Sequence, residues 1–214
     1  MNWLGDRVQK EVSPTDTVLD LGCGIMQATL DTCPTYPPTR LKCAHITGVD
    51  LYEPYLDVLK DETGVTVLRL SIPSQLPVFV DNSYDVVLLN DVLEHLEPTP
   101  AALALVEAER IARKKIIINT PIMYDNNEYA MSDTYPYKNL GENELQRHQW
   151  LVPADWLKES GYNLTFTKGQ IFGVKALPQY INELAEDFLR ENEKAALSQY
   201  PWRYRVKKLL DKVR

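Results

Sequence analysis

Two glycines that directly follow a short apolar run mark the stretch of this chain best suited to binding a ligand. The run 17–21 favours a strand and continues into Gly22 and Gly24, and Asp20 stands two positions before the first glycine. Because glycine has no Cβ, the backbone can turn sharply here and a ligand can lie against the main chain. A strand, a tight turn and a helix start are together typical of nucleotide sites. We therefore expect a nucleotide-like ligand beside Asp20, Gly22 and Gly24.

The order of residues in the turn, Asp-Leu-Gly-Cys-Gly, resembles the first motif of the class I S-adenosylmethionine-dependent methyltransferases. A dinucleotide-binding turn has the pattern G-x-G-x-x-G, and here Gln27 stands at its third glycine. The Y-x-x-x-K pair of short-chain dehydrogenases occurs only in the tail, as Tyr204 and Lys208. The resemblance implies S-adenosylmethionine as the cofactor and methyl transfer as the activity. A turn that binds no ligand is the alternative.

Length and composition indicate a soluble protein built on one α/β domain. The chain has 214 residues, of which 44% are hydrophobic and 25% charged, and no apolar run approaches the roughly 18 residues of a membrane span. We expect it in the cytoplasm. The net charge of −7 disfavours nucleic acid as a partner, because phosphate contacts need clustered lysine and arginine. Cys23, Cys33 and Cys43 fit neither a disulfide framework nor a zinc pattern and are interpreted as reduced thiols.

Strand and helix patterns alternate along the chain. Strands are predicted at 17–21, 44–50, 65–70, 84–90 and 114–121, with a hairpin of two short strands within 162–177. Helices are predicted at 2–12, 26–32, 53–61, 99–114 and 153–161. The predicted fold class is α/β, a Rossmann-like, doubly wound, mostly parallel seven-stranded sheet with an antiparallel last strand. By the resemblance, residues 1–177 form the methyltransferase domain, and residues 178–214 are a C-terminal helical extension.

Strand ends are the next candidates, because ligands of an open parallel sheet lie beyond the carboxyl ends of its strands. Asp50 ends the second strand. By the resemblance, Asp50 accepts hydrogen bonds from both ribose hydroxyls and Leu51 packs against adenine, whereas a helix cap is the alternative role of this acid. Ser71 and Ile72 follow the third strand, where relatives carry an acid that holds the adenine amino group. We therefore expect main-chain groups or the serine to hold adenine.

The segment after the fourth strand, Asn-Asp-Val-Leu-Glu-His-Leu-Glu-Pro at 90–98, resembles that of small-molecule methyltransferases related to the ubiquinone-pathway enzymes. By this resemblance Asn90 and Asp91 lie beside the methionine part of the cofactor. Glu94 and His95 are interpreted as capping and packing residues. Met26 stands where the family has the third glycine of G-x-G-x-G, and we expect it to narrow the space beside the methionine part.

Methyl transfer needs an aligned acceptor and, for a hydroxyl acceptor, a group that takes its proton. His148 is the candidate catalytic base, because His45 opens a buried strand and His95 lies near the cofactor; a structural histidine is the alternative. His148 follows the long segment 120–147, which contains four tyrosines and is interpreted as an acceptor lid.

The sequence therefore predicts methyl transfer to a small-molecule or a glycan- or lipid-linked acceptor, with O-methylation favoured over N-methylation. The alternative function is a non-catalytic, methyltransferase-like protein that binds the cofactor or a partner. No metal is predicted. A metal-dependent site like that of the catechol O-methyltransferases, with Asp91, Asp125 and Asn126 as ligands, is the alternative, although the sequence around Asp91 does not resemble that group. The Asn-Pro-Pro-Tyr type of motif is absent at Asn90, so we expect no base methylation.

The tail has a basic and amphipathic pattern. Five apolar residues share one face of a helix predicted at 202–214, namely Trp202, Val206, Leu209, Leu210 and Val213. Most of the other residues of this helix are lysine or arginine. We interpret the apolar face as packing on the domain or on a second subunit of a homodimer. The alternative is a peripheral contact of 201–214 with an anionic membrane surface.

Overall fold

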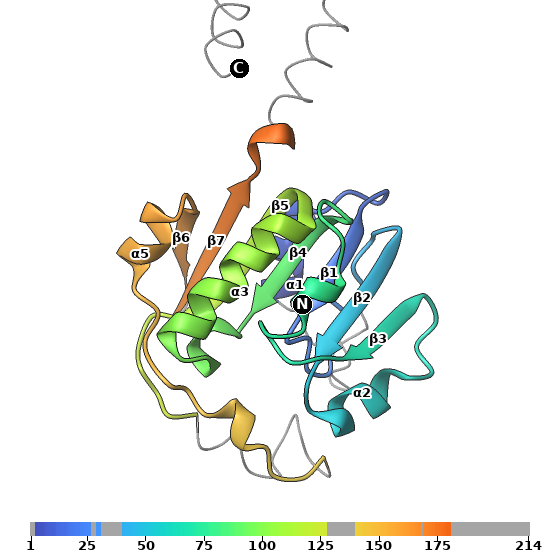
Figure 1. The fold of residues 1–214 in the computed structure, drawn as a ribbon, viewed down its shortest axis with the longest axis horizontal. Helices are drawn as coiled ribbons and strands as arrows, with labels where there is room; N and C mark the ends of the chain where they lie inside the picture. Colours follow the sequence, from blue (N-terminus) through green and yellow to red (C-terminus); the bar gives the residue numbers. More distant parts are fainter. Residues whose placement is uncertain (1–2, 27–28, 31–39, 128–139, 168, 181–214) are drawn as a thin grey trace, which may run out of the picture.

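The structure, a computed structural model, describes residues 3–26, 29–30, 40–127, 140–167 and 169–180 (Figure 1). Within these residues seven strands form one sheet in the spatial order β3-β2-β1-β4-β5-β7-β6. The strands are β1 (Thr17–Leu21), β2 (His45–Asp50), β3 (Val65–Arg69), β4 (Tyr84–Asn90), β5 (Ala112–Pro121), β6 (Asn163–Thr167) and β7 (Gln170–Ala176). The first five run parallel, and β7 is antiparallel to both of its neighbours. The predicted fold class is confirmed.

The order of the strands determines where a ligand can lie. The chain places β2 and β3 on one side of β1 and then crosses to place β4 and β5 on the other side. In sheets of this kind the crevice lies outside the carboxyl ends of the strands at which the order reverses. Leu21, at the end of β1, pairs with Val49 of β2 and with Leu89 of β4. The carboxyl ends of these three strands therefore meet at one edge of the sheet.

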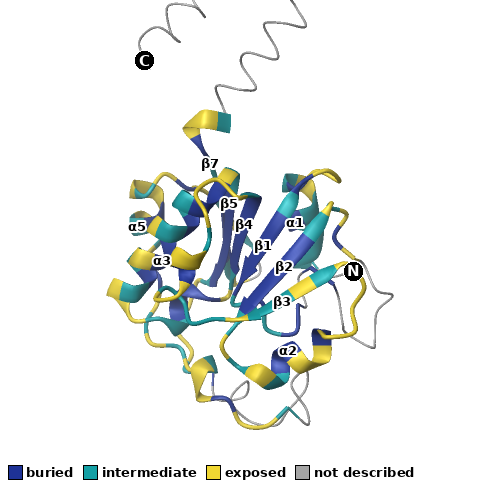
Figure 2. Cartoon of the chain, turned by 45° about the vertical axis from the view of Figure 1, so that its right-hand side comes forward, coloured by how far each residue is buried: buried dark blue, intermediate teal, exposed yellow. Residues whose placement is uncertain are grey.

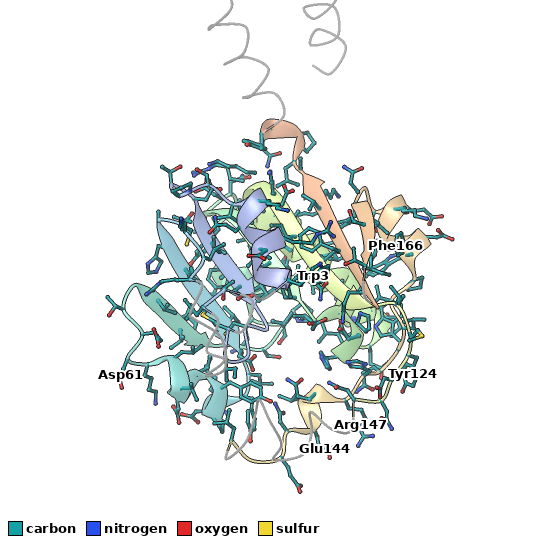
Figure 3. The ribbon with its side chains drawn as sticks, turned by 180° about the vertical axis from the view of Figure 1, so that it is seen from behind. Trp3, Asp61, Tyr124, Glu144, Arg147 and Phe166 are labelled. Carbon is teal, nitrogen blue, oxygen red and sulfur yellow. The ribbon has the colours of Figure 1, made fainter. Side chains whose placement is uncertain are left out.

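Helices cover both faces of the sheet. Helix α3 (Pro98–Ile111) lies in front of the strands in Figure 1, and α1 (Trp3–Glu11) lies over the opposite face in Figure 3. Strand residues alternate between these layers, since Leu19 packs in the same core cluster as the alanines of α3 and Val18 packs with Val8 of α1. Figure 2 shows that the central strands are buried. The remaining helices are α2 (Glu53–Leu59), α5 (Ala154–Glu159) and the 3-10 turns η1 (Leu76–Val78), η2 (Leu93–His95) and η3 (Glu144–Gln146).

Two helix predictions differ from the structure at one end. Most of the predicted helix 26–32 lies outside the described residues; its first residue, Met26, has a φ angle of +56° and is not part of a right-handed helix. The helix predicted to reach Lys114 ends at Ile111 instead, and β5 begins at Ala112. As part of the strand, Lys114 pairs with Asp16 at 2.6 Å. This contact fixes the start of β5.

Several predictions concern residues outside the part of the chain that the structure describes. These are the centre of the segment 120–147, the tail helix at 202–214 and the thiol of Cys33. Cys23 and Cys43 are free cysteines. Among the described residues, no helix is both long and apolar enough to cross a membrane.

Candidate active site

A pocket of about 240 Å³ opens at the carboxyl ends of β1, β2 and β4. Six of the nine residues predicted to contact a cofactor line it: Gly22, Asp50, Leu51, Ser71, Ile72 and Asp91. The rest of its wall consists of Leu70, Val92, His95, Leu96, Asn143, Leu145 and Gln146. Asp20, Gly24 and Asn90 do not line it. The structure therefore brings most of the predicted residues together around one cavity.

The glycine turn forms one end of the pocket. Gly22 has a φ angle of +67°, and a Cβ at this position would lie 2.6 Å from Cγ2 of Val92. Gly24, with φ at +51°, donates its backbone N–H to Oδ2 of Asp50 at 2.9 Å. Only glycine combines this backbone conformation with such a close approach at position 22. The turn therefore both borders the pocket and orients Asp50.

Asp50 presents a carboxylate with remaining capacity to accept hydrogen bonds. Its Oδ2 accepts from Gly24, and its Oδ1 accepts from the backbone N–H of Tyr52 at 2.9 Å. A carboxylate has about four acceptor sites, and the backbone N–H of Leu51 also contributes a hydrogen bond, so about one site remains for a ligand. Burial raises the pKa of Asp50, although the backbone N–H groups oppose the shift. Next to it, Leu51 is 40% exposed and forms an apolar wall.

Asp20 and Met26 lie beneath the turn rather than in the pocket wall. Asp20 is buried and accepts a hydrogen bond from Oγ1 of Thr29 at 3.1 Å. Met26 is 1% exposed and packs in the core against Gly48. The expectation that Met26 narrows the space beside the cofactor is therefore wrong, because its left-handed backbone directs the side chain into the core.

The segment 140–147 closes over the pocket, a contact that the sequence analysis missed. The hydroxyl of Tyr52 donates to the carbonyl oxygen of Leu140 at 2.7 Å and lies 3.2 Å from that of Glu142. Asn143 and Gln146 line the pocket from this segment. The segment was interpreted as an acceptor lid, but its described C-terminal part forms a wall of the same cavity as Asp50. Its length was the only signal in the sequence.

Asp91 and Asn90 follow the end of β4. Asp91 has a φ angle of +52° and accepts a hydrogen bond from Nδ2 of Asn119 at 2.9 Å. Its carboxylate is accessible from the pocket, whereas protein atoms enclose its other sides, and this burial raises its pKa to about 6. The side-chain amide of Asn90 is buried, and neither of its polar atoms has a hydrogen-bond partner among the described residues.

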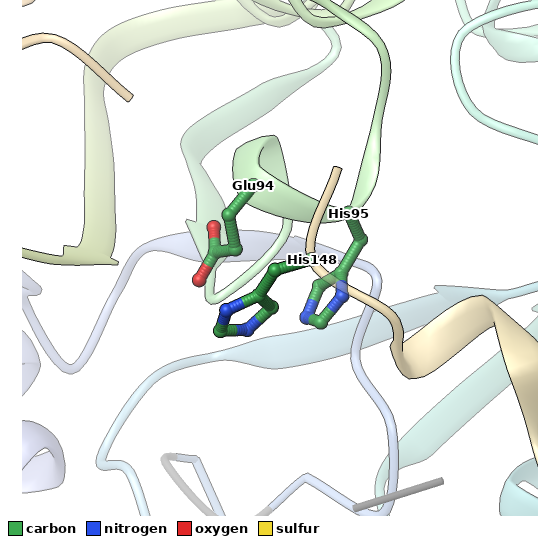
Figure 4. A group of neighbouring side chains, drawn as sticks. All are labelled: Glu94, His95 and His148. Atoms are coloured by element: carbon green, nitrogen blue, oxygen red, sulfur yellow. The ribbon is translucent and has the colours of Figure 1, made fainter. Parts of the chain in front are cut away.

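His95 and His148 meet at the edge of the pocket. Their ring centroids are 4.8 Å apart, and Glu94 lies beside them (Figure 4). His95 lines the pocket, whereas His148 lies behind it. Burial is the main cause that lowers the pKa of both imidazoles, that of His95 to about 4, so both rings are neutral near pH 7.

Glu94 is a fully buried acid in the same place. Its Oε2 accepts a hydrogen bond from Oγ1 of Thr120 at 3.1 Å. Burial, followed by the charge of Asp91, raises the pKa of Glu94 well above its usual range. Glu94 and His95 were interpreted as capping and packing residues; both pack against neighbouring side chains, and His95 in addition lines the pocket.

A comparison with family models identifies the domain. Residues 19–118 match a model described as a methyltransferase domain, and the pocket lies at the strand ends of this matched region. The chain carries a methyltransferase domain. Among curated proteins, none matches the chain by sequence.

Solved structures share the fold of this methyltransferase domain. An S-adenosylmethionine-dependent methyltransferase from Archaeoglobus fulgidus is 15% identical with a TM-score of 0.57, covering 81% of this chain and 93% of that one. A 1,6-didemethyltoxoflavin-N1-methyltransferase from Burkholderia thailandensis is 15% identical with a TM-score of 0.55, covering 82% and 76%. A putative methyltransferase from Bacillus halodurans is 20% identical with a TM-score of 0.52, covering 78% and 71%. At 15–20% sequence identity, the similarity to these structures shows a shared fold only.

The chemistry of the pocket in the methyltransferase domain suits S-adenosylmethionine. A nucleoside needs an acceptor for its ribose hydroxyls and apolar surface for its base, and Asp50, Leu51 and Ile72 offer both along one wall. The catechol-type alternative is not favoured by the geometry, since neither Asp125 nor Asn126 lines the pocket and Oδ1 of Asp125 accepts from the backbone of Asn127.

Proposed function

We propose that this domain transfers a methyl group from S-adenosylmethionine to a hydroxyl of a small-molecule or a glycan- or lipid-linked acceptor. The observation that carries the proposal is the position of the His95–His148 pair at the edge of the pocket that Asp50 and the glycine turn form. The pocket offers a cofactor site, and the pair offers neutral imidazoles where an acceptor would enter.

The residues of this chain bind and orient the cofactor. Asp50 accepts hydrogen bonds from the ribose hydroxyls, Leu51 and Ile72 flank adenine, and Gly22 leaves room for the methionine part. When bound, S-adenosylmethionine supplies a methyl carbon on a positively charged sulfur, so that the acceptor oxygen forms the new C–O bond while the C–S bond breaks and its electron pair stays on sulfur.

The histidine pair acts on the acceptor. A hydroxyl must lose its proton as it attacks, and a neutral imidazole assists this loss. His148 was predicted from the sequence as the base, and it lies against His95, which faces the pocket. The segment 140–147 covers the cavity and helps to exclude water.

A screen with methyl-labelled cofactor tests this function. Extracts of small molecules, glycans and lipids are incubated with the protein, and labelled products are identified by mass. We expect a labelled methyl ether. A labelled amine would show that the protein is an N-methyltransferase and not an O-methyltransferase. Binding of S-adenosylhomocysteine without any labelled product would favour the non-catalytic alternative.

His148→Ala is the matching variant. We expect turnover of the identified acceptor to fall by at least about 100-fold, because the group acts in the transition state. The affinity for S-adenosylhomocysteine should stay within about twofold, as no pocket contact is lost. His45→Ala is the control, since His45 contacts Thr66 on β3. Equal losses of turnover and cofactor affinity would make His148 a structural residue.

A further inference from the structure

Glu94, His95 and His148 form a group of potential metal ligands beside the pocket. One ligating atom of each residue lies within 4.8 Å of the others (Figure 4). Two come from η2, directly after β4, and the third comes from the segment before α5. One carboxylate oxygen and two imidazole nitrogens are a typical ligand set for a divalent transition metal.

Two atoms of this group have no partner in the part of the chain that the structure describes. Oε1 of Glu94 and Nδ1 of His148 are buried and make no hydrogen bond there. Buried polar atoms are normally paired. A carboxylate oxygen and an imidazole nitrogen both offer lone pairs, so a cation between them would pair with both.

The charge of the surroundings also favours a cation. The carboxyl group of Asp91 interacts with that of Glu94; Glu94 is buried, whereas Asp91 is open to the pocket. No ion pair among the described residues includes either acid. Buried or crowded carboxyl groups are normally paired with a cationic side chain or a metal ion, so a divalent cation would fit beside these two acids.

The surrounding contacts hold the ligands in place. Nδ1 of His95 lies 3.3 Å from the carbonyl oxygen of Arg147. When Nδ1 carries the proton and donates it to this oxygen, Nε2 keeps a free lone pair. Metal-binding histidines usually have this arrangement. The backbone N–H of Gln149 donates to the carbonyl oxygen of Glu94 at 2.7 Å, and Nε1 of Trp150 donates to that of Leu93 at 2.9 Å. The two segments that carry the ligands are therefore bound to each other.

We propose that Glu94, His95 and His148 bind a divalent transition-metal ion, with Asp91 beside it, at the edge of the pocket. Three protein ligands leave coordination positions open. His95 and Asp91 also line the pocket, so an acceptor oxygen placed next to the cofactor reaches the ion. A bound ion would polarise this oxygen and lower the pKa of the hydroxyl, whose proton would pass to solvent water. His148 would then serve as a ligand, and its role as a base under the proposed function would apply only to the metal-free protein. The role of the ion toward the acceptor rests on the proposed function, whereas metal binding does not.

Calorimetric titration with MnCl₂ tests the site. The full-length protein is prepared without a polyhistidine tag and stripped with a chelator. We expect one Mn²⁺ per chain, and affinity at least about tenfold lower in Glu94→Gln and in His148→Asn. His45→Asn is the matched control and should bind as the wild type does. MgCl₂ should bind more weakly, because two imidazoles favour a transition metal over Mg²⁺.

Two further measurements keep the outcomes distinct. Circular dichroism checks that each variant is folded, and His95→Asn replaces a variant that is not. No Mn²⁺ binding by the wild type, or equal binding by the wild type and the folded ligand variants, would overturn the metal site. Titration of the same samples with S-adenosylhomocysteine separates this result from the proposed function. Cofactor binding without Mn²⁺ binding would overturn only the metal site, and Mn²⁺ binding without cofactor binding would overturn only the proposed function.

Discussion

Asp50 is the residue that connects the glycine turn to the ligand pocket. Its two oxygens accept backbone hydrogen bonds from Gly24 and Tyr52, and the residue lines the cavity with capacity for a further hydrogen bond. We predict that Asp50→Ala weakens binding of S-adenosylmethionine by about 1.5–3 kcal/mol, the usual cost of removing a charged hydrogen-bond partner. Calorimetry measures this. Asp57→Ala, on the exposed side of α2, should leave affinity unchanged. Unchanged affinity in the Asp50 variant would place the ribose elsewhere.

Asp20 makes stability depend on pH. Burial raises its pKa from 3.8 to about 7, with a smaller contribution from the charge of Asp50, while the hydrogen bond from Thr29 opposes the shift. Between these two values the folded state binds more protons than the unfolded state, so the free energy of unfolding falls as pH rises from 4 to 7.

The variant Asp20→Asn lacks this titration. We compare the free energy of unfolding of the variant with that of the wild type. We predict that the variant value minus the wild-type value rises by up to roughly 4 kcal/mol between pH 4 and pH 8. Urea unfolding at a series of pH values measures the difference. Asp91 and Glu94 titrate in both proteins and cancel in the comparison. A difference that does not change with pH would show that Asp20 is ionised throughout.

At the scale of elements, the start of α2 holds the segment 140–147 over the pocket. The hydroxyl of Tyr52 donates to Leu140 at 2.7 Å. We predict that Tyr52→Phe lowers affinity for S-adenosylhomocysteine by about two- to tenfold, the equivalent of one hydrogen bond. Hydrogen exchange should become faster in 140–147. Tyr84→Phe is the control, since it also loses one hydroxyl bond, to Thr47 within the sheet. Equal effects of the two variants would show a general loss of stability.

At the scale of the whole molecule, the buried residues of both core clusters in the described part of the chain lie between Val8 and Leu177. We predict that a chain of residues 1–180 remains folded and binds S-adenosylhomocysteine within about twofold of the full chain, because the pocket and both clusters are retained. Circular dichroism and calorimetry check this. Loss of folding in the shortened chain would make residues 181–214 part of the domain.

The same pair of proteins tests the tail. Packing of residues 201–214 on the domain or on a second subunit predicts that neither protein sediments with anionic vesicles. Retention of the full chain alone, on anionic but not on neutral vesicles, would show the membrane contact instead.

The sequence by itself determined the fold class, the strand positions and six of the thirteen residues that line the pocket. Strands and turns follow from neighbouring residues, since alternating or continuous apolar runs and glycines act locally. Strand ends in a parallel sheet share one edge, so Gly22, Asp50 and Asp91 were predicted to be close before the structure was known. The predicted helix start at Met26 is wrong, because a left-handed conformation is not a local preference of methionine.

Only the tertiary structure brought His95 and His148 together and placed Glu94 between them and Thr120. Glu94 and Thr120 are close because β4 pairs with β5. His148 joins them because the chain after residue 140 runs back along the turn η2, where the backbone N–H of Gln149 donates to the carbonyl oxygen of Glu94. The wall formed by Asn143 and Gln146 arises in the same way, from a tyrosine hydroxyl far away in the sequence. Contacts between distant segments leave no periodic pattern, so composition and spacing do not reveal them.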